Sequence, residues 1–289
     1  MRYVYFGTPD FSAHVLERLI AADMPPVAVV TNPDRPFGRK KIMTAPPVKQ
    51  LLERLKVNSE KLTVSILQPE KLDAEFIEKL KSFNADFFLV FAYNKIFRKN
   101  ILDIPRLGII GIHPSFLPQY RGPSPFQTAL LNGEPETGAT LYCLREGVDD
   151  GPIVAESKPV SITDDDTFVS LASKLADISA NLAIETVPKY VDGKITPWAQ
   201  DESQATFTKK FKTEDGFVEP DYFAAAENGD AEKSAALHRK IRALNPEPGV
   251  WTMKNGKRMK LLEAKLTNGK LRLTKIQEEG QKPREVGSG

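Results

Sequence analysis

Histidine is scarce in this chain of 289 residues, and one of its three copies, His113, ends the apolar run GIIGIH. Such a run predicts a buried β-strand with the imidazole at its carboxyl end. A glycine-flanked acidic loop, EGVDDG, follows at 146–151 and contains Asp149 and Asp150. An imidazole near a carboxylate can act as an acid, as a base or as a donor that polarises a carbonyl. A histidine satisfied by a backbone carbonyl, beside a loop of turn-forming acids, remains the open alternative.

Other catalytic chemistries find little support in the residues. His14 lies in an expected helix and His238 in a basic C-terminal segment, so both are interpreted as surface or packing residues. Cys143 is the only cysteine, which excludes an intramolecular disulfide and disfavours a cysteine-rich zinc site. The first turn, FGTPDF, has one glycine where a dinucleotide fold has three, and no phosphate-binding loop occurs. We therefore expect neither a metal nor a nucleotide cofactor.

The first half of the chain alternates β-rich runs with helical patterns. This alternation predicts a Rossmann-like, doubly wound and mostly parallel α/β sheet, whose ligands bind beyond the carboxyl ends of its strands. His113 falls at such an end. Strands are expected at 2–8, 25–32, 62–68, 85–94 and 108–113, and helices at 12–22, 45–57 and 73–83.

The second half predicts a helix at 124–131, strands at 137–145 and 151–162, and a long helix at 166–193. Short β-rich runs split by Asn-Gly turns at 255–256 and 268–269 then predict a small C-terminal OB-like β-barrel. The expected organisation is a catalytic domain at 1–190, a linker at 191–206, a barrel domain at 207–282 and a disordered tail at 283–289.

Composition places the chain among globular proteins, with 41% hydrophobic and 27% charged residues. No apolar run reaches 18 residues, and the N-terminus begins as a strand, so a cytoplasmic protein without a membrane span is expected, and nothing demands more than a monomer. Residues 1–204 carry a net charge of −3 and residues 205–289 one of +5. The basic C-terminal part suggests an anionic partner such as nucleic acid, with an ordinary lysine-rich surface as the open alternative.

Residues 113–154, HPSFLPQYRGPSPFQTALLNGEPETGATLYCLREGVDDGPIV, resemble the catalytic core of the folate-dependent formyltransferases. The shared pattern is H-x-S-x-L-P-x-x-R-G, followed by T-G-x-T and G-x-D-x-G. Further stretches at 6–19, 30–49, 207–219 and 239–252 are similar to members of this family that act on methionyl-tRNA, so the resemblance covers nearly the whole chain.

The resemblance implies formyl transfer from 10-formyltetrahydrofolate to the α-amino group of methionine on initiator tRNA, without a metal. His113 matches the catalytic histidine and Asp149 the catalytic aspartate. The position of the folate-contacting segment falls on Ser115, Phe116, Leu117 and Pro118, with Ala92 and Tyr93 beside it. The cations expected to contact tRNA are Arg35, Arg39, Lys40 and Lys41 in the loop RPFGRKK, and Lys209, Lys210, Arg239 and Arg242 in the C-terminal part.

Two positions depart from the family pattern. Lys40 replaces a glycine of the basic loop. More importantly, the family has an asparagine two residues before the histidine, and this chain has Gly111. Loss of one oxyanion donor costs roughly 10²–10³ in rate. We hypothesise that Asn94, at the end of the neighbouring strand, supplies the amide. The alternatives are a formyltransferase for an amino sugar nucleotide and a catalytically impaired tRNA- or folate-binding homologue.

Overall fold

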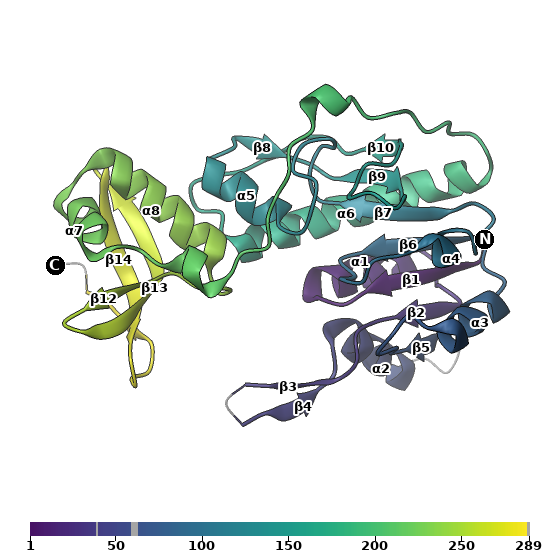
Figure 1. Cartoon of the computed structure of the whole chain (residues 1–289), viewed down its shortest axis with the longest axis horizontal. Helices are drawn as coiled ribbons and strands as arrows, with labels where there is room; N and C mark the ends of the chain where they lie inside the picture. The colour runs from purple at the N-terminus through teal and green to yellow at the C-terminus, as the bar shows by residue number, and fades with distance from the viewer. Residues whose placement is uncertain (39, 59–62, 288–289) are drawn as a thin grey trace. The chain divides into compact units, whose positions relative to one another are not determined.

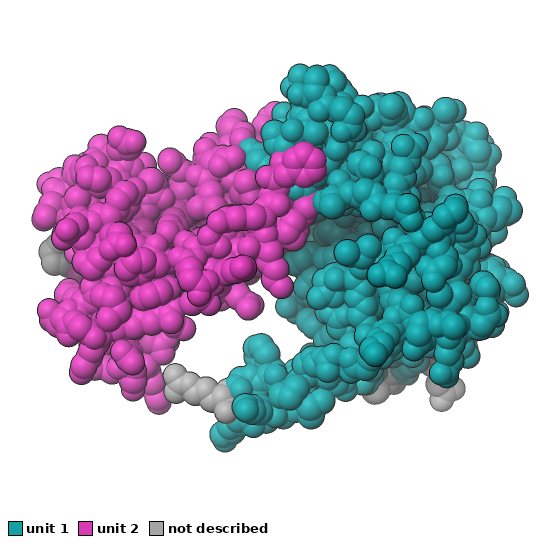
Figure 2. Space-filling view, viewed as in Figure 1, with its two compact units in different colours: residues 1–121, 138–160, 173–206 teal, residues 122–137, 161–172, 207–289 magenta. Residues whose placement is uncertain are grey.

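A computed structural model describes residues 1–38, 40–58 and 63–287 of the chain. These residues form two compact units, coloured separately in Figure 2. Unit 1 comprises residues 1–121, 138–160 and 173–206, and unit 2 comprises residues 122–137, 161–172 and 207–289. Each unit therefore contains segments that are far apart in the sequence.

A seven-stranded sheet forms the centre of unit 1, in the order β10-β9-β7-β6-β1-β2-β5 (Figure 1). Its parallel strands are β1 (Tyr3–Gly7), β2 (Ala28–Val30), β5 (Ser65–Leu67), β6 (Phe87–Phe91) and β7 (Ile109–His113). The strands β9 (Thr140–Cys143) and β10 (Ile153–Glu156) extend it in antiparallel pairing. The prediction of a doubly wound and mostly parallel sheet is confirmed.

Helices cover both faces of this sheet, because its central strands are apolar on both sides. On one face, Phe6 of β1 packs in a core cluster with Phe76 and Leu80 of α3. On the other face, the Tyr5 hydroxyl donates to the Ser12 carbonyl oxygen of α1 at 2.8 Å. The helices that carry residues of unit 1 are α1 (Asp10–Ala21), α2 (Pro47–Asn58), α3 (Ala74–Ser82), α4 (Lys99–Leu102) and α6 (Phe168–Val191), the last of which begins in unit 2.

Unit 2 is built on a four-stranded antiparallel sheet in the order β12-β13-β14-β15. Its strands are β12 (Trp251–Lys254), β13 (Lys257–Thr267), β14 (Lys270–Glu278) and β15 (Arg284–Glu285). Asn-Gly pairs form the two tight turns, and Asn255 and Asn268 have φ values of 52° and 51°. The helices α5 (Pro125–Asn132), α7 (Pro220–Asn228) and α8 (Ala231–Leu244) complete the unit.

Several elements were not expected from the sequence. The basic loop forms a β-hairpin of β3 (Arg35–Phe37) and β4 (Ile42–Thr44). The tail expected to be disordered contains β15, whose Arg284 pairs with Ile276 of β14. Short elements complete the chain: β8 (Glu136–Thr137), β11 (Val160–Ser161) and the 3₁₀ turns η1 (Glu202–Gln204) and η2 (Thr213–Gly216). Within the described residues, no helix has both the length and the apolar character needed to span a bilayer.

The core of unit 1 predicts a measurable stability difference. Leu80 is fully buried in the cluster between α3 and the sheet, so Leu80→Ala should lower the free energy of unfolding by about 2–5 kcal/mol. Leu266, which is 38% exposed, serves as the matched control, and its alanine variant should lose far less. Urea unfolding of both variants checks this expectation, and equal losses would contradict it.

Candidate active site

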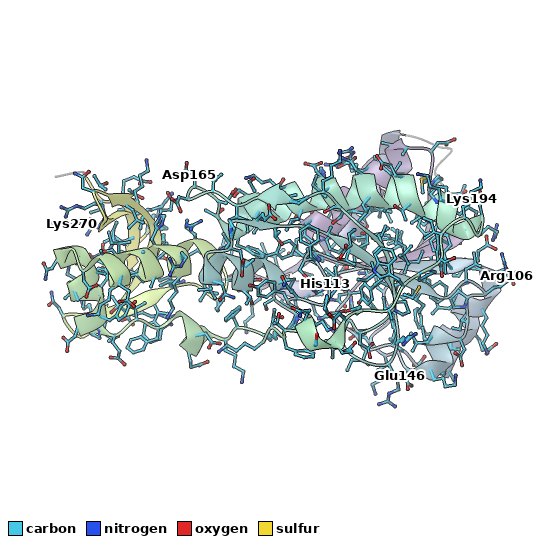
Figure 3. All side chains as sticks on the ribbon, turned by 90° about the horizontal axis from the view of Figure 1, so that it is seen from above. Arg106, His113, Glu146, Asp165, Lys194 and Lys270 are labelled. Atoms are coloured by element: carbon cyan, nitrogen blue, oxygen red, sulfur yellow. The ribbon has the colours of Figure 1, made fainter. Side chains whose placement is uncertain are left out.

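His113 is the last residue of β7 and only 5% exposed (Figure 3). Its Nε2 lies 2.8 Å from the carbonyl oxygen of Tyr120. A carbonyl oxygen only accepts hydrogen bonds, so Nε2 carries the hydrogen. The other ring nitrogen, Nδ1, is thereby left to face a different partner.

That partner is Asp149 of the acidic loop, whose Oδ2 lies 3.5 Å from Nδ1 of His113. An ionised carboxylate and an unprotonated Nδ1 are both acceptors, so close approach between them requires a shared proton. The pair can therefore hold one proton in addition to the hydrogen on Nε2. A site of this kind can take a proton from one reacting group and deliver it to another.

Tyr142 of β9 completes this cluster. Its hydroxyl donates a hydrogen bond to Oδ1 of Asp149, and its ring meets the His113 ring edge-to-face with 6.4 Å between centroids. Burial of the phenol, reinforced by the charge of Asp149, raises the pKa of Tyr142 well above its usual value. The phenol consequently stays protonated and acts as a donor. Sequence reasoning did not find this residue.

The space beside Gly111 is filled. A Cβ at this position would lie 2.5 Å from Cε1 of Tyr142 and 2.4 Å from Cδ1 of Leu144. Asn94 is exposed, and its Oδ1 accepts a hydrogen bond from Nδ2 of Asn32 at 3.1 Å. The idea that Asn94 reaches into empty space next to Gly111 therefore needs correction, because Tyr142 and Leu144 occupy that space.

The segment expected to be a linker contributes directly to the cluster. Nε2 of Gln200 donates to the carbonyl oxygens of Asp149 at 2.8 Å and Gly151 at 2.6 Å. Arg121 is 2% exposed and donates to Oε1 of Gln200 and to both carboxylate oxygens of Glu202. The hydrogen bond with Glu202 contributes most to raising the pKa of Arg121, and the charges of Asp150 and Asp149 add to it.

The residues assigned to folate binding occupy two different settings. Ser115 is buried, with its hydroxyl donating to the Gln119 carbonyl oxygen at 2.6 Å, and its own carbonyl oxygen accepts from Oγ1 of Thr140 at 2.7 Å. The segment from Ser115 to Pro118 is thus held in place by β9. Ala92 is exposed, with φ 54°, whereas the Tyr93 ring packs against Phe6 in the core.

The basic hairpin exposes cations and apolar side chains together. Lys40 and Lys41 are exposed in the turn, and Arg35 pairs with Glu70 at 2.6 Å on the surface. Phe37 is 76% exposed. Arg39 lies outside the described residues. Within those that the structure describes, no group of three or more histidine, cysteine or acidic side chains is arranged to hold a metal ion.

The C-terminal cations differ in availability. Lys210 is exposed, Lys209 pairs with Asp215, and Nε of Arg239 donates to the Leu131 carbonyl oxygen at 3.1 Å.

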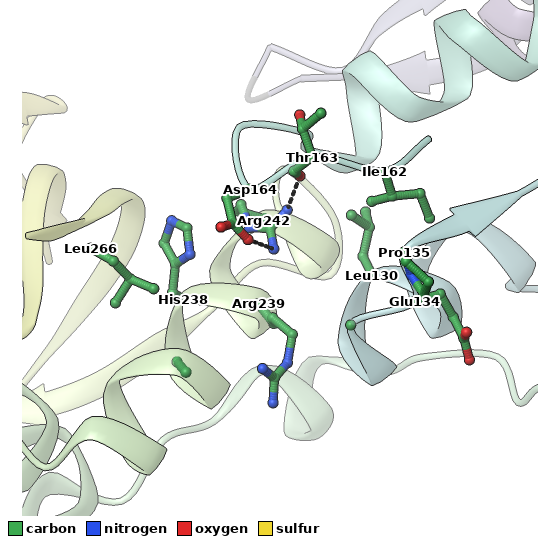
Figure 4. Close-up of a pocket in the computed structure, with 12 residues that line it drawn as sticks. Leu130, Glu134, Pro135, Ile162, Thr163, Asp164, His238, Arg239, Arg242 and Leu266 are labelled. Carbon is green, nitrogen blue, oxygen red and sulfur yellow. Dashed lines mark hydrogen bonds and ion pairs between the residues drawn. The ribbon is translucent and has the colours of Figure 1, made fainter. Parts of the chain in front are cut away.

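Arg242 has a different setting, because it is 7% exposed and borders a cavity of about 400 Å³ in unit 2 (Figure 4). Its Nη1 donates to the carbonyl oxygens of Thr163 at 3.1 Å and Asp166 at 2.6 Å. Burial lowers the pKa of Arg242. We therefore interpret this residue as an anchor for the loop that precedes α6, rather than as a phosphate contact.

A strand-end histidine paired with a loop aspartate, on a doubly wound sheet, defines a site for acid–base chemistry on a ligand at the sheet edge. The family model described as formyl transferase matches residues 1–187, and the model of the formyl transferase C-terminal domain matches residues 231–287. The chain therefore belongs to the formyl transferase family.

Similar curated proteins carry a more specific name. The methionyl-tRNA formyltransferase of Halorhodospira halophila is 39% identical over 86% of this chain and 74% of its own length. The protein of the same name from Staphylococcus epidermidis is 36% identical over 93% of this chain and 81% of its own length.

Solved structures share the fold at lower identity. The methionyl-tRNA formyltransferase from Clostridium thermocellum has a TM-score of 0.60 at 18% identity, covering 96% of this chain and 98% of that one. A sugar N-formyltransferase from Shewanella has a TM-score of 0.66 at 13% identity, covering 93% and 99%. The fold therefore does not by itself select the acceptor.

The buried setting of Arg242 predicts a structural role. Arg242→Met should lower the free energy of unfolding by about 2–4 kcal/mol, because the carbonyl oxygens of Thr163 and of the buried Asp166 lose a charged donor. Arg239→Met removes a half-buried cation with one such bond and should cost about 1 kcal/mol. Urea unfolding compares the two variants, and an equal or larger loss for Arg239→Met would refute the assignment.

Proposed function

We propose that this protein transfers a formyl group from 10-formyltetrahydrofolate to the α-amino group of methionine esterified to initiator tRNA. The observation that carries the proposal is the His113–Asp149 pair at the carboxyl edge of the sheet, in a chain whose relatives named methionyl-tRNA formyltransferase match it over most of its length. Because the acceptor is a substrate of translation, we place the protein in the cytoplasm.

The reaction requires proton movement between two nitrogens. When bound, the folate supplies the formyl carbon; a C–N bond forms to the amine of methionine, and the C–N bond to the folate nitrogen breaks. The amine loses a proton and the leaving nitrogen gains one, so the overall proton count is unchanged. The shared proton position between Nδ1 of His113 and Oδ2 of Asp149 suits this exchange. The segment from Ser115 to Pro118, held by Thr140, is the proposed folate contact.

We propose one set of tRNA contacts in unit 1 and another in unit 2. In unit 1, the hairpin carries Lys40 and Lys41 for phosphates, and Phe37 offers a ring on which a base can stack. In unit 2, we propose Lys209, Lys210 and Arg239 as further phosphate contacts, without the buried Arg242.

Formylation of charged initiator methionyl-tRNA, with 10-formyltetrahydrofolate as donor, is the direct test. Wild-type protein should be active, and His113→Ala and Asp149→Asn should each lose at least about 10² in kcat because the proton position is lost. Asn94→Ala tests the hypothesis that the Asn94 amide takes part in the reaction, although it does not fill the space beside Gly111. That hypothesis predicts a loss of activity. Formylation of an amino sugar nucleotide instead of tRNA would overturn the proposal, and binding without turnover would favour the impaired homologue.

The hairpin predicts a salt-dependent contribution to tRNA affinity. Lys40→Ala combined with Lys41→Ala should weaken tRNA binding and reduce the slope of log K against log salt by about 1–2, because each lost phosphate contact removes about one released counterion. Lys189→Ala with Lys194→Ala removes two exposed lysines near the end of α6 and should leave the slope unchanged. An unchanged slope in the hairpin variant would argue against the contact.

A further inference from the structure

We propose that Gly111 and Tyr142 are a matched pair, in which the missing side chain of Gly111 admits Tyr142 as the positioning residue for Asp149. The inference rests on the proposed function, and it accounts for the absence of the asparagine that the family pattern has at this position. In this interpretation the glycine at 111 does not impair the active site, because the space of the missing side chain is used by Tyr142.

The register of the sheet brings the two residues together. Gly111 of β7 stands directly opposite Tyr142 of the antiparallel strand β9. A Cβ at position 111 would approach the ring of Tyr142 to 2.5 Å at Cε1 and 2.7 Å at Cζ. These atoms belong to a ring that also packs with Leu117 and Ile153, so the ring has little room to move. Any side chain at 111, asparagine included, is therefore incompatible with Tyr142 in this position.

The position of the ring determines what its hydroxyl does. Tyr142 is 6% exposed, and its hydroxyl donates to Oδ1 of Asp149 while Oδ2 faces Nδ1 of His113 at 3.5 Å. The two carboxylate oxygens thus have separate partners. Nε2 of Gln200 donates a hydrogen bond to the backbone carbonyl oxygen of Asp149. Asp149 itself has a φ of 49°. Tyr142 thereby restrains the rotation of the carboxylate on that backbone.

The interaction suits a positioning role more than a packing role. An aliphatic or phenylalanine side chain would fill the same apolar cluster without placing a hydroxyl against a carboxylate. The charged and titratable groups around the carboxylate include His113 on β7, Tyr142 on β9 and Asp150 in the same loop. The pKa of Arg121 is raised mainly by its hydrogen bond with Glu202, and the charges of both aspartates add to this effect. Among these groups, Tyr142 donates a neutral hydrogen bond to Oδ1 of Asp149, which restrains the orientation of the carboxylate.

Tyr142→Phe removes only the hydroxyl and is the primary test. We expect kcat for formylation to fall roughly 10- to 100-fold, with KM for methionyl-tRNA within about twofold, because one hydrogen bond to a charged group is lost. The loss should fall on kcat at an unchanged temperature of thermal unfolding, because the phenylalanine ring still fills the apolar cluster with Leu117 and Ile153. A merely structural role would lower the unfolding temperature and leave kcat of the folded protein unchanged.

Tyr190→Phe is the matched control. The Tyr190 hydroxyl contacts Sγ of Cys143 at 3.6 Å and the Leu107 carbonyl oxygen at 3.2 Å in the same unit, without touching the acidic loop. Its loss should leave kcat and KM unchanged. Thermal unfolding of both phenylalanine variants reports whether they remain folded.

Gly111→Ala tests the other half of the pair. The added Cβ should displace the ring and reproduce the loss of kcat of Tyr142→Phe. Both changes act through one hydrogen bond, so the double variant should be about as active as the less active of the two single variants. If Gly111→Ala fails to fold, Tyr142→Phe still decides the question.

The outcomes separate this proposal from the proposed function. An inactive wild-type protein would overturn the function itself. An active wild type whose Tyr142→Phe variant keeps its kcat would leave the function standing and overturn the matched pair. Multiplicative losses in the Gly111→Ala, Tyr142→Phe double variant would also contradict the pair.

Discussion

The antiparallel pairing of β9 with β7 is the constraint on which the site depends. This ladder sets Thr140 opposite His113 and Tyr142 opposite Gly111. Successive side chains of a strand point to opposite faces, so residues two apart share a face and both pairs act on the same side of the sheet. A register slip of one residue would move Tyr142 to the other face and separate its hydroxyl from Asp149. The catalytic arrangement is therefore a consequence of the register in which the antiparallel strand β9 pairs with the parallel strand β7.

Segments distant in sequence then restrain the acidic loop. Gln200, which lies 51 residues beyond Asp149, binds two carbonyl oxygens of the loop, and Arg121 binds Gln200 in turn. The backbone bridge between Ile153 and Trp198 continues this attachment along β10. A loop held at several points loses little additional entropy when substrate binds, which favours catalysis by a pre-organised site.

Local patterns were sufficient to predict much of the fold. The apolar runs of the parallel strands, the Asn-Gly turns at 255–256 and 268–269, and the strand-end position of His113 all follow from short-range periodicity and turn chemistry. The role of Tyr142 could not be predicted in this way, because it depends on a cross-strand register between residues thirty-one positions apart. Gln200 lay in a segment without periodicity, and its two bonds to the loop are non-local.

Non-local contacts also explain the remaining differences between the expected and the observed structure. The basic loop has the composition of a solvated segment, yet the pairing of Arg35 with Thr44 makes it a hairpin. The tail was expected to be disordered because terminal residues often are, but Arg284 and Glu285 pair with β14 as the edge strand β15. The resemblance to the folate-dependent formyltransferases implied Asp149 as the partner of His113, whereas the steric relation between Gly111 and Tyr142 required coordinates.

The most direct test of this account is the protonation state of His113, measured by NMR of protein labelled with ¹⁵N at histidine, with His113→Asn used to assign the signals. The account predicts that neutral His113 carries its hydrogen on Nε2, bound to the Tyr120 carbonyl oxygen, and that Nδ1 takes up the second proton next to Asp149. A neutral ring with its hydrogen on Nδ1 would contradict the account.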